Sequence, residues 1–217
     1  MDIEVISFGH DGIIIADLQE SDVDVVTKEV YSIKEDFDSH KKATDFLAGN
    51  MEHEYKVSQD SIQCLDRILR PLIDEYNKKF TCVRDIMVLD NDLPMELVYS
   101  WVNFQKKHEF NPAHRHGGVF SFILWIDVPF SYEDEIQSPS IVGSNTKCPG
   151  VVEWLYTGTL GRVEGFKLPV DKTYNYKLAL FSSAMMHLVY PFYTSDDYRI
   201  SVSGNYFLTD KYLKNNM

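Results

Sequence analysis

The sequence predicts a mainly β fold, either a sandwich or a jelly roll, with helices at its N-terminal end. Beyond residue 84 the chain shows short segments with an apolar period of two, and turn residues separate many of them. Before that point, two segments have the period of a helix. With 217 residues, 44% of them apolar, the chain can bury one substantial core. We therefore expect a single domain over 1–217, with 1–83 as mostly helical support and 84–210 as the jelly-roll core.

The first elements expected are two strands and a helix. Residues 2–18 predict a strand, a turn at Gly9 to Gly12, and a second strand through the apolar run that follows. Ser21 and Asp22 can cap the next helix. Its buried face is predicted by apolar residues at helical spacing, which are Val26, Val30, Ile33 and Phe37. From there a loop is expected to about Val57.

The strongest helical pattern covers residues 58–80. Pro71 lies inside it and should kink or split the helix, because proline lacks the N–H donor and its ring clashes with the preceding turn. Such an apolar face is a packing surface, so we expect the helices to buttress a sheet. The face comprises Ile62, Leu65, Leu69, Leu72, Tyr76 and Phe80, widened by Ile68 and Ile73.

Eight strands are expected in the second half of the chain, and short strands separated by turn residues are typical of a sandwich or jelly roll. The segment 131–150 is different, since it is rich in acidic residues, Ser, Pro, Gly and Asn. We interpret it as a long inserted loop. The strands are 85–90, 95–105, 118–128, 151–157, 161–167, 176–182, 186–191 and 198–208.

Charge and cysteine content exclude some classes of function. The net charge is −12 and the pI about 4.9, which disfavours binding to nucleic acid or to anionic membranes. Three scattered cysteines fit a reducing compartment. The start of the chain lacks a basic signal-peptide region, and its apolar run at 12–16 is too short to span a membrane. We expect a cytoplasmic protein, in the host cytoplasm if phage-encoded.

Three histidines are placed as metal ligands would be. His114 and His116 are two residues apart where a strand should begin, and in an extended segment both side chains point to the same face. His187 follows 71 residues later in an apolar run, on another expected strand. An unpaired histidine is costly to bury there. The alternative is a histidine that donates one hydrogen bond to a backbone carbonyl.

The last expected strand has one entirely polar face, formed by Arg199, Ser201, Ser203 and Asn205. Such a face is usually exposed to solvent. In a closed jelly roll it could instead line a polar cavity. In that case Arg199 would bind a carboxylate with both arms of its guanidinium, and Ser201 would be a second donor to the same group. Three imidazoles, an arginine and hydroxyls together would suit a metal and an acidic small molecule.

With these residues the chain resembles the Fe(II)/2-oxoglutarate-dependent oxygenases, most of all small oxygenases of tailed bacteriophages and marine bacteria that are distantly similar to prolyl hydroxylases. The resemblance covers about half the chain, from Tyr99 to Leu208. It implies a double-stranded β-helix with N-terminal helices packed on the larger sheet. The matching motifs are Trp101-Val102-Asn103, Asn111-Pro112-Ala113-His114-Arg115-His116, the strand 120–125, Gly150-Val151-Val152-Glu153-Trp154, the stretch 180–187 and the stretch 199–205.

The resemblance also implies a reaction and its ligands. Fe(II) would be held by His114, His116 and His187, and the co-substrate 2-oxoglutarate by the metal, Arg199 and Ser201. The products would be succinate, CO₂ and a hydroxylated substrate, with the oxidation chemistry supplied by the metal. The wider superfamily has His-x-Asp or His-x-Glu in its triad. This chain departs from that pattern because a histidine stands at position 116.

Two other functions fit the same residues. One is a cupin with a three-histidine metal site, similar to thiol dioxygenases, which needs no 2-oxoglutarate. The other is a non-enzymatic phage-type structural or interaction protein on a degenerate oxygenase fold. The primary substrate, a protein side chain or a small molecule, does not follow from the sequence. Segments 104–112 and 131–150 are candidates to frame the site entrance, and the aromatic candidates near the site are Tyr99, Trp101, Trp125 and Trp154.

Overall fold

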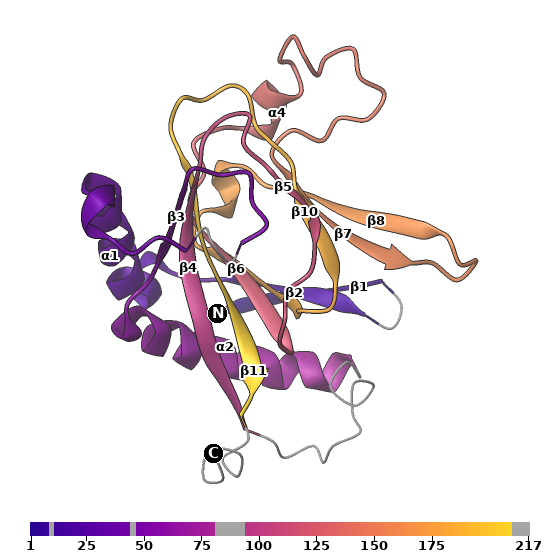
Figure 1. The fold of residues 1–217 in the computed structure, drawn as a ribbon. Coiled ribbons are helices and arrows are strands. Elements are labelled where there is room, and N and C mark those ends of the chain that lie inside the picture. Colours follow the sequence, from indigo (N-terminus) through magenta and orange to yellow (C-terminus); the bar gives the residue numbers. More distant parts are fainter. Residues whose placement is uncertain (9–10, 44–46, 81–93, 210–217) are drawn as a thin grey trace.

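The computed structural model describes residues 1–8, 11–43, 47–80 and 94–209, and it shows two β-sheets that face each other (Figure 1). All neighbouring strands are antiparallel. The larger sheet has the order β1 (Asp2–Ser7), β2 (Gly12–Asp17), β9 (Lys177–Ser182), β6 (Phe120–Asp127), β11 (Arg199–Leu208), β4 (Met95–Gln105), β3 (His53–Lys56). The smaller sheet has the order β5 (Asn111–His114), β10 (Met186–Val189), β7 (Val151–Thr157), β8 (Val163–Pro169).

The helices cover the outer face of the larger sheet (Figure 1). The two long ones are α1 (Asp24–Glu35) and α2 (Gln59–Lys79). A short helix, α4 (Tyr132–Glu135), lies in the connection between β6 and β7. Three 3₁₀ turns complete the named helical elements of the described chain: η1 (Glu20–Val23), η2 (Phe37–Ser39) and η4 (Lys172–Tyr174).

The central strands of the larger sheet are buried on both faces. Along β2, Ile14 and Ala16 pack with the helices, while Ile13 and Ile15 pack toward the smaller sheet. Successive side chains of a strand point to opposite faces, so an uninterrupted apolar run supplies both cores at once. The core between the sheets includes Ile123, Trp125, Val152, Trp154, Phe181 and Phe192.

Several expectations for the helical half are confirmed and others are wrong. Helix α2 begins after Ser58, whose Oγ accepts a hydrogen bond from the Ser61 backbone N–H, and it continues unbroken through Pro71. The expected cap at Ser21 and Asp22 is wrong. Those residues lie inside η1, where the Asp22 carboxylate accepts from the backbone N–H of Gln19. A short hydrogen-bonded turn therefore precedes α1.

The expected loop before Val57 is also wrong, because it contains β3. This strand pairs with β4 and forms one edge of the larger sheet, so the front of the chain supplies strands as well as helices. In the second half seven of the eight expected strands are present, with β8 starting two residues later than expected. The strand expected at 85–90 lies outside the described residues. Strand β5 lies between the expected strands 95–105 and 118–128, where no strand was expected.

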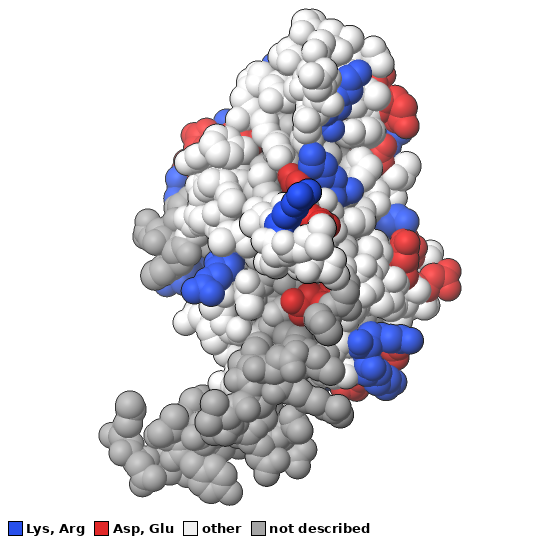
Figure 2. Space-filling model, turned by 90° about the vertical axis from the view of Figure 1, so that its right-hand side faces the viewer, with Lys and Arg blue, Asp and Glu red and all other residues white. Residues whose placement is uncertain are grey.

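Charge is mixed on the side of the molecule that carries β7 and β8, where basic and acidic side chains alternate over the surface (Figure 2). Lys167 and Glu153 form one such pair, 4.0 Å apart. Within the described ranges, every helix is too short or too polar to cross a bilayer.

Candidate metal centre

His114 and His187 are brought together by strand pairing. They are directly opposite each other in the antiparallel ladder between β5 and β10. Side chains at paired positions point to the same face of a sheet. The two ring centroids are accordingly only 4.3 Å apart. The two histidines are 73 positions apart in the sequence and are brought together by a backbone pairing that no local pattern encodes.

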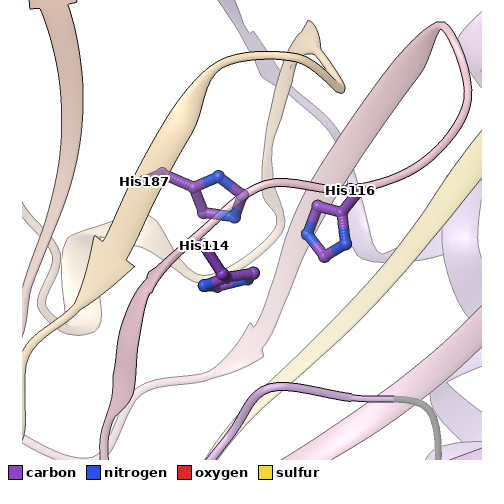
Figure 3. Close-up of side chains that lie close together, drawn as sticks. All are labelled: His114, His116 and His187. Carbon is purple, nitrogen blue, oxygen red and sulfur yellow. The ribbon is translucent and has the colours of Figure 1, made fainter.

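His116 joins the pair from the connection that follows β5. Its backbone N–H donates to the carbonyl of Ser183, 3.0 Å away, which fixes this connection to the turn before β10. The expectation that both histidines project from one strand is thus wrong, since β5 ends at His114. The three rings nevertheless point toward a common centre, and their ligand nitrogens all lie within 4.8 Å of one another (Figure 3).

Hydrogen bonds fix the orientation of two of the rings. Nδ1 of His114 lies 2.7 Å from the carbonyl of Pro112, and Nδ1 of His187 lies 3.1 Å from that of Met185. A carbonyl can only accept, so Nδ1 carries the proton in each ring. The neutral ring then has its lone pair on Nε2, which is the arrangement of most metal-binding histidines.

Burial keeps the three rings neutral. It lowers the pKa of His187 well below its ordinary value, with a further contribution from the neighbouring histidines. The pKa of His116 falls to about 4 for the same two reasons, and burial also lowers the pKa of His114. At neutral pH the site therefore offers lone pairs instead of protons, as metal binding requires.

The donor set fits a single first-row transition metal. Imidazole nitrogens suit iron, zinc, copper and nickel, and bind at roughly 2.1 Å. Three nitrogens within 4.8 Å of one another can close on one ion by small rotations of the rings. The site brings no carboxylate of its own to the triad, so a bound divalent ion would keep its full positive charge until an anionic ligand arrives.

Arg199 and Ser201 line the same cavity as the histidines, from the opposite sheet. Arg199 is 2% exposed. Its guanidinium donates to the side-chain oxygen of Gln105 through Nε and Nη2, to the carbonyl of Gly150 at 2.7 Å, and to that of Tyr190 at 3.2 Å. All these acceptors are neutral, so no carboxylate of the described chain hydrogen-bonds to this buried cation.

The charge of Arg199 is therefore only partly compensated. Burial lowers its pKa to about 9, and the nearby carboxylate of Glu135 opposes that shift. An anion in the cavity would relieve this cost, because a buried charge is stable only when it is paired. The polar face expected on the last strand faces the cavity and not the solvent, since Arg199, Ser201 and Ser203 all line the cavity.

Sequence reasoning missed several polar residues of the cavity wall. Glu54 was placed in a loop, whereas it lies on β3 and is 1% exposed. Asn103 and Gln105 of β4 also line the cavity, and so does Asn111 of β5. Trp101, Asn103 and Gln105 alternate along one strand and therefore share a face. This pattern could have identified Asn103 and Gln105 as residues of the cavity wall.

A larger groove adjoins the metal cavity. Its volume is about 650 Å³, and it shares the lining residues Leu47, Trp101 and His116 with the cavity. Of the aromatic candidates, Trp101 and Trp125 line the cavity, and the 57% exposed Tyr99 lines the groove. Trp154 belongs to the core between the sheets.

The two segments expected at the entrance differ in their position. Segment 104–112 supplies Gln105 and Asn111 to the cavity wall. Segment 131–150 supplies none of the described lining residues of either the cavity or the groove. The groove beside the cavity is lined instead by residues before β3, among them Ala43 and Leu47, and by Arg115, His116 and Gly117 after β5.

Solved structures with a similar fold are oxygenases. A prolyl-4-hydroxylase of Pseudomonas putida has a TM-score of 0.55 at 12% identity, over 92% of this chain and 94% of that one. A Trichoplax adhaerens prolyl hydroxylase, in complex with a hypoxia inducible factor oxygen degradation domain peptide fragment, has a TM-score of 0.54 at 14% identity, over 90% and 83%. The non-heme α-ketoglutarate-dependent epimerase SnoN from nogalamycin biosynthesis has a TM-score of 0.55 at 13% identity, over 91% of this chain and 78% of that one.

No protein-family model matches the chain, and no curated protein sequence does. At these identities the similarity concerns the fold. The chain has the fold of the Fe(II)/2-oxoglutarate oxygenases, and the predicted jelly roll is confirmed. The narrower likeness to phage and marine oxygenases stays a prediction.

Proposed function

We propose that this chain is an Fe(II)/2-oxoglutarate-dependent oxygenase that hydroxylates its substrate and converts 2-oxoglutarate and O₂ to succinate and CO₂. The observation that carries the proposal is the triad: three neutral imidazoles, one buried and two half-buried, converge in the cavity of an oxygenase fold, and backbone carbonyls orient two of them. A structural histidine needs only one hydrogen-bond partner, whereas three neutral rings that meet at one point are the arrangement expected of metal ligands.

His114, His116 and His187 would hold the iron, which supplies the activation of O₂ when bound. The backbone bonds to Pro112 and Met185 keep the first and last of these rings in the tautomer that presents Nε2. The three rings are neutral, so the negative charge that balances the ion has to come from 2-oxoglutarate, which is a dianion at neutral pH.

The distal carboxylate of 2-oxoglutarate would bind Arg199 and Ser201. The guanidinium is held in position by Gln105 and two carbonyls, which use four of its five N–H donors and leave one Nη1 hydrogen for the carboxylate. Ser201 Oγ lies 3.4 Å from the side-chain amide nitrogen of Asn103, which donates to it and leaves the hydroxyl proton for the ligand. Arg199 is buried and Ser201 is half-buried, and low solvent access strengthens their bonds to a carboxylate.

The primary substrate would reach the metal through the groove lined by Tyr99 and Trp101. Its volume of about 650 Å³ suits a side chain on a peptide or a small molecule. The Trichoplax adhaerens structure of similar fold contains a peptide fragment. A protein side chain is therefore a reasonable first class to test, with small metabolites as the second.

The test is formation of the ternary complex without O₂. Fe(II)-loaded protein mixed anaerobically with 2-oxoglutarate should develop a visible metal-to-ligand charge-transfer band. His187→Ala should abolish the band and reduce the bound iron. His40→Ala is the matched control, because His40 lies at the end of η2, outside the cavity, and the band should be unchanged.

Other outcomes identify the alternatives. If iron binds to the three histidines but 2-oxoglutarate produces neither a band nor thermal stabilisation, the three-histidine cupin-type dioxygenase replaces our proposal. If the purified protein takes up no metal and His187→Ala leaves its properties intact, the protein is a non-enzymatic one on this fold.

A further inference from the structure

Glu54 is a buried carboxylate that the proposed reaction does not use. It is 1% exposed, and its Oε2 has no hydrogen-bond partner in the described chain. An unpaired buried carboxyl group is one of the more expensive features that a fold can contain. The same residue lines the cavity of the three histidines. An unsatisfied acceptor on the wall of a cavity indicates a ligand that satisfies it.

A second unsatisfied acceptor lies beside it. Oδ1 of Asn111, at the start of β5, is buried and without a partner among the described residues. Gly49 packs against both side chains. If this glycine carried a Cβ atom, that atom would lie within 3.0 Å of both Asn111 Oδ1 and Glu54 Oε1, so the two oxygens are close to each other. Two acceptors therefore share one corner of the cavity.

Strand register shows which corner this is. Ser201, Asn103 and Glu54 are paired across β11, β4 and β3, so their side chains form one row on the inner face of the sheet. Two strand spacings separate Ser201 from Glu54, roughly 10 Å. The row thus begins at the proposed 2-oxoglutarate site and ends at the edge strand.

The edge strands of the two sheets, β3 and β5, carry this acceptor pair. The segment before β3 passes close to β5 (Figure 1), and it is joined there by the bond from the backbone N–H of Asn50 to the carbonyl of Phe110, 2.9 Å long. The groove approaches the same place, since Lys56 and Trp101 form the next row of the ladder and both line it. A substrate in the groove would therefore pass His116 and meet Glu54.

We propose that the Glu54 carboxylate and Asn111 Oδ1 bind an ammonium group of the primary substrate, so that the enzyme acts on an amine-bearing molecule or side chain. This inference rests on the proposed function, because it names the substrate class of the same site. An ammonium carries three donors and no acceptor, and so it satisfies two acceptors at once. A carboxylate ligand would add a third acceptor to the corner and is excluded by repulsion.

The electrostatics of the corner agree with a cationic ligand. Burial, with a smaller contribution from Glu109, raises the pKa of Glu54 to about 7. A cation would convert this carboxyl to its charged form at neutral pH and form a charge-assisted bond with it. Glu54 is not a member of the ligand cluster, which among the described residues comprises the three histidines.

The experiment measures binding of n-butylammonium, n-butanol and n-butyrate to the full-length protein at pH 8, by calorimetry. The titrations are run with Zn(II) at the histidines and again without it, because zinc held by three histidines keeps an open position that an amine or a carboxylate could occupy. We expect n-butylammonium to bind at least tenfold more tightly than the other two probes. Glu54→Leu should weaken its binding at least tenfold, and Glu54→Gln should weaken it because the charge is lost.

Glu109→Gln is the matched control. It removes the neighbouring charge but leaves the acceptor pair, and n-butylammonium binding should stay within threefold of wild type. Three results would each overturn the proposal: equal binding of the three probes, a loss of n-butylammonium binding in Glu109→Gln as large as in Glu54→Leu, or loss of zinc in Glu54→Gln.

The peptides acetyl-Gly-Lys-Gly-amide and acetyl-Gly-Leu-Gly-amide then separate the two sources of the amine. Preference for the lysine peptide assigns a protein side chain, and preference for butylammonium alone assigns a small amine.

The two proposals can fail separately. Binding of n-butylammonium is read without iron, 2-oxoglutarate or turnover, so a missing charge-transfer band leaves this result standing. Conversely, a normal band with no discrimination among the three probes removes the amine site and leaves the oxygenase.

Discussion

Arg199 is the residue whose role is best defined by what surrounds it. Its guanidinium is buried, anchored by Gln105 and two backbone carbonyls, and hydrogen-bonded to no carboxylate in the described chain. The same anchors that orient it also prevent it from relaxing toward solvent. The guanidinium therefore offers a carboxylate its buried charge and the one N–H donor that these anchors leave free.

We predict that Arg199→Lys weakens 2-oxoglutarate binding by roughly 10- to 100-fold, because lysine keeps the charge but cannot make the bonds to Gln105, Gly150 and Tyr190 that position the donor, and a hydrogen bond to a charged group contributes about 1.5 to 3 kcal/mol. Anaerobic titration of the charge-transfer band measures the dissociation constant. Arg70→Lys, at an exposed pair with Asp66 on α2, is the matched control and should leave it unchanged. Equal affinity of Arg199→Lys and wild type would show that another cation holds the carboxylate.

At the level of elements, one buried side chain joins the inserted segment 131–150 to the connection between β10 and β11. Glu135 of α4 is fully buried. Its carboxylate accepts hydrogen bonds from the backbone N–H groups of Tyr193 and Thr194, at 2.8 and 2.7 Å, and from the Thr194 hydroxyl. The segment therefore fixes the connection between β10 and β11, and this connection precedes Arg199.

We predict that Glu135→Gln lowers the free energy of unfolding by about 3 kcal/mol, since an amide group replaces one oxygen of a buried acceptor that three donors share. Urea denaturation measures the change. Glu133→Gln, on the exposed face of the same short helix, should change stability by no more than about 0.5 kcal/mol. A similar effect of both substitutions would mean that Glu135 does not anchor the segment.

Helix α2 carries a proline that its packing tolerates. Pro71 is exposed, and the helix runs through it over 21 residues. We predict that Pro71→Ala stabilises the protein by about 1 to 3 kcal/mol, because alanine restores the missing backbone donor and removes the ring clash without leaving a cavity. Thermal denaturation provides the readout. Gln63→Ala, exposed in the same helix, controls for helix propensity and should give only a few tenths of a kcal/mol. No gain in Pro71→Ala would show that the fold requires a proline there.

For the molecule as a whole, Glu54 couples the substrate corner to stability. Its folded pKa of about 7 lies above the ordinary value of 4.5, so between these values the folded state binds more protons than the unfolded state. Stability therefore falls as pH rises from 4.5 to 7, and the cost is fully present above pH 7.

We predict that Glu54→Gln removes this dependence. Relative to wild type, its free energy of unfolding should rise by about 3 kcal/mol between pH 4.5 and pH 7.5. Urea denaturation of both proteins across this range checks the prediction. A constant difference would show that Glu54 is already ionised at low pH and is satisfied within the fold.

The sequence by itself determined most of the local structure. Apolar residues at a period of two predicted the strands of the second half, and apolar residues three to four apart predicted both long helices. Both predictions work because backbone geometry decides which face of an element a side chain lies on. Residue type and order also singled out His114, His116, His187 and Arg199. Glu54 escaped this reading, since β3 is a four-residue edge strand with no clear period.

Only the tertiary structure decided how these parts meet. The ladder between β5 and β10 places His187 opposite His114, and the ladder from β11 to β3 puts Glu54 in the row of Ser201. Pairing between distant strands depends on the closure of both sheets around one core, and no local period encodes it. For that reason the sequence identified the metal ligands by type, whereas the fold revealed the acceptor pair that we assign to the substrate.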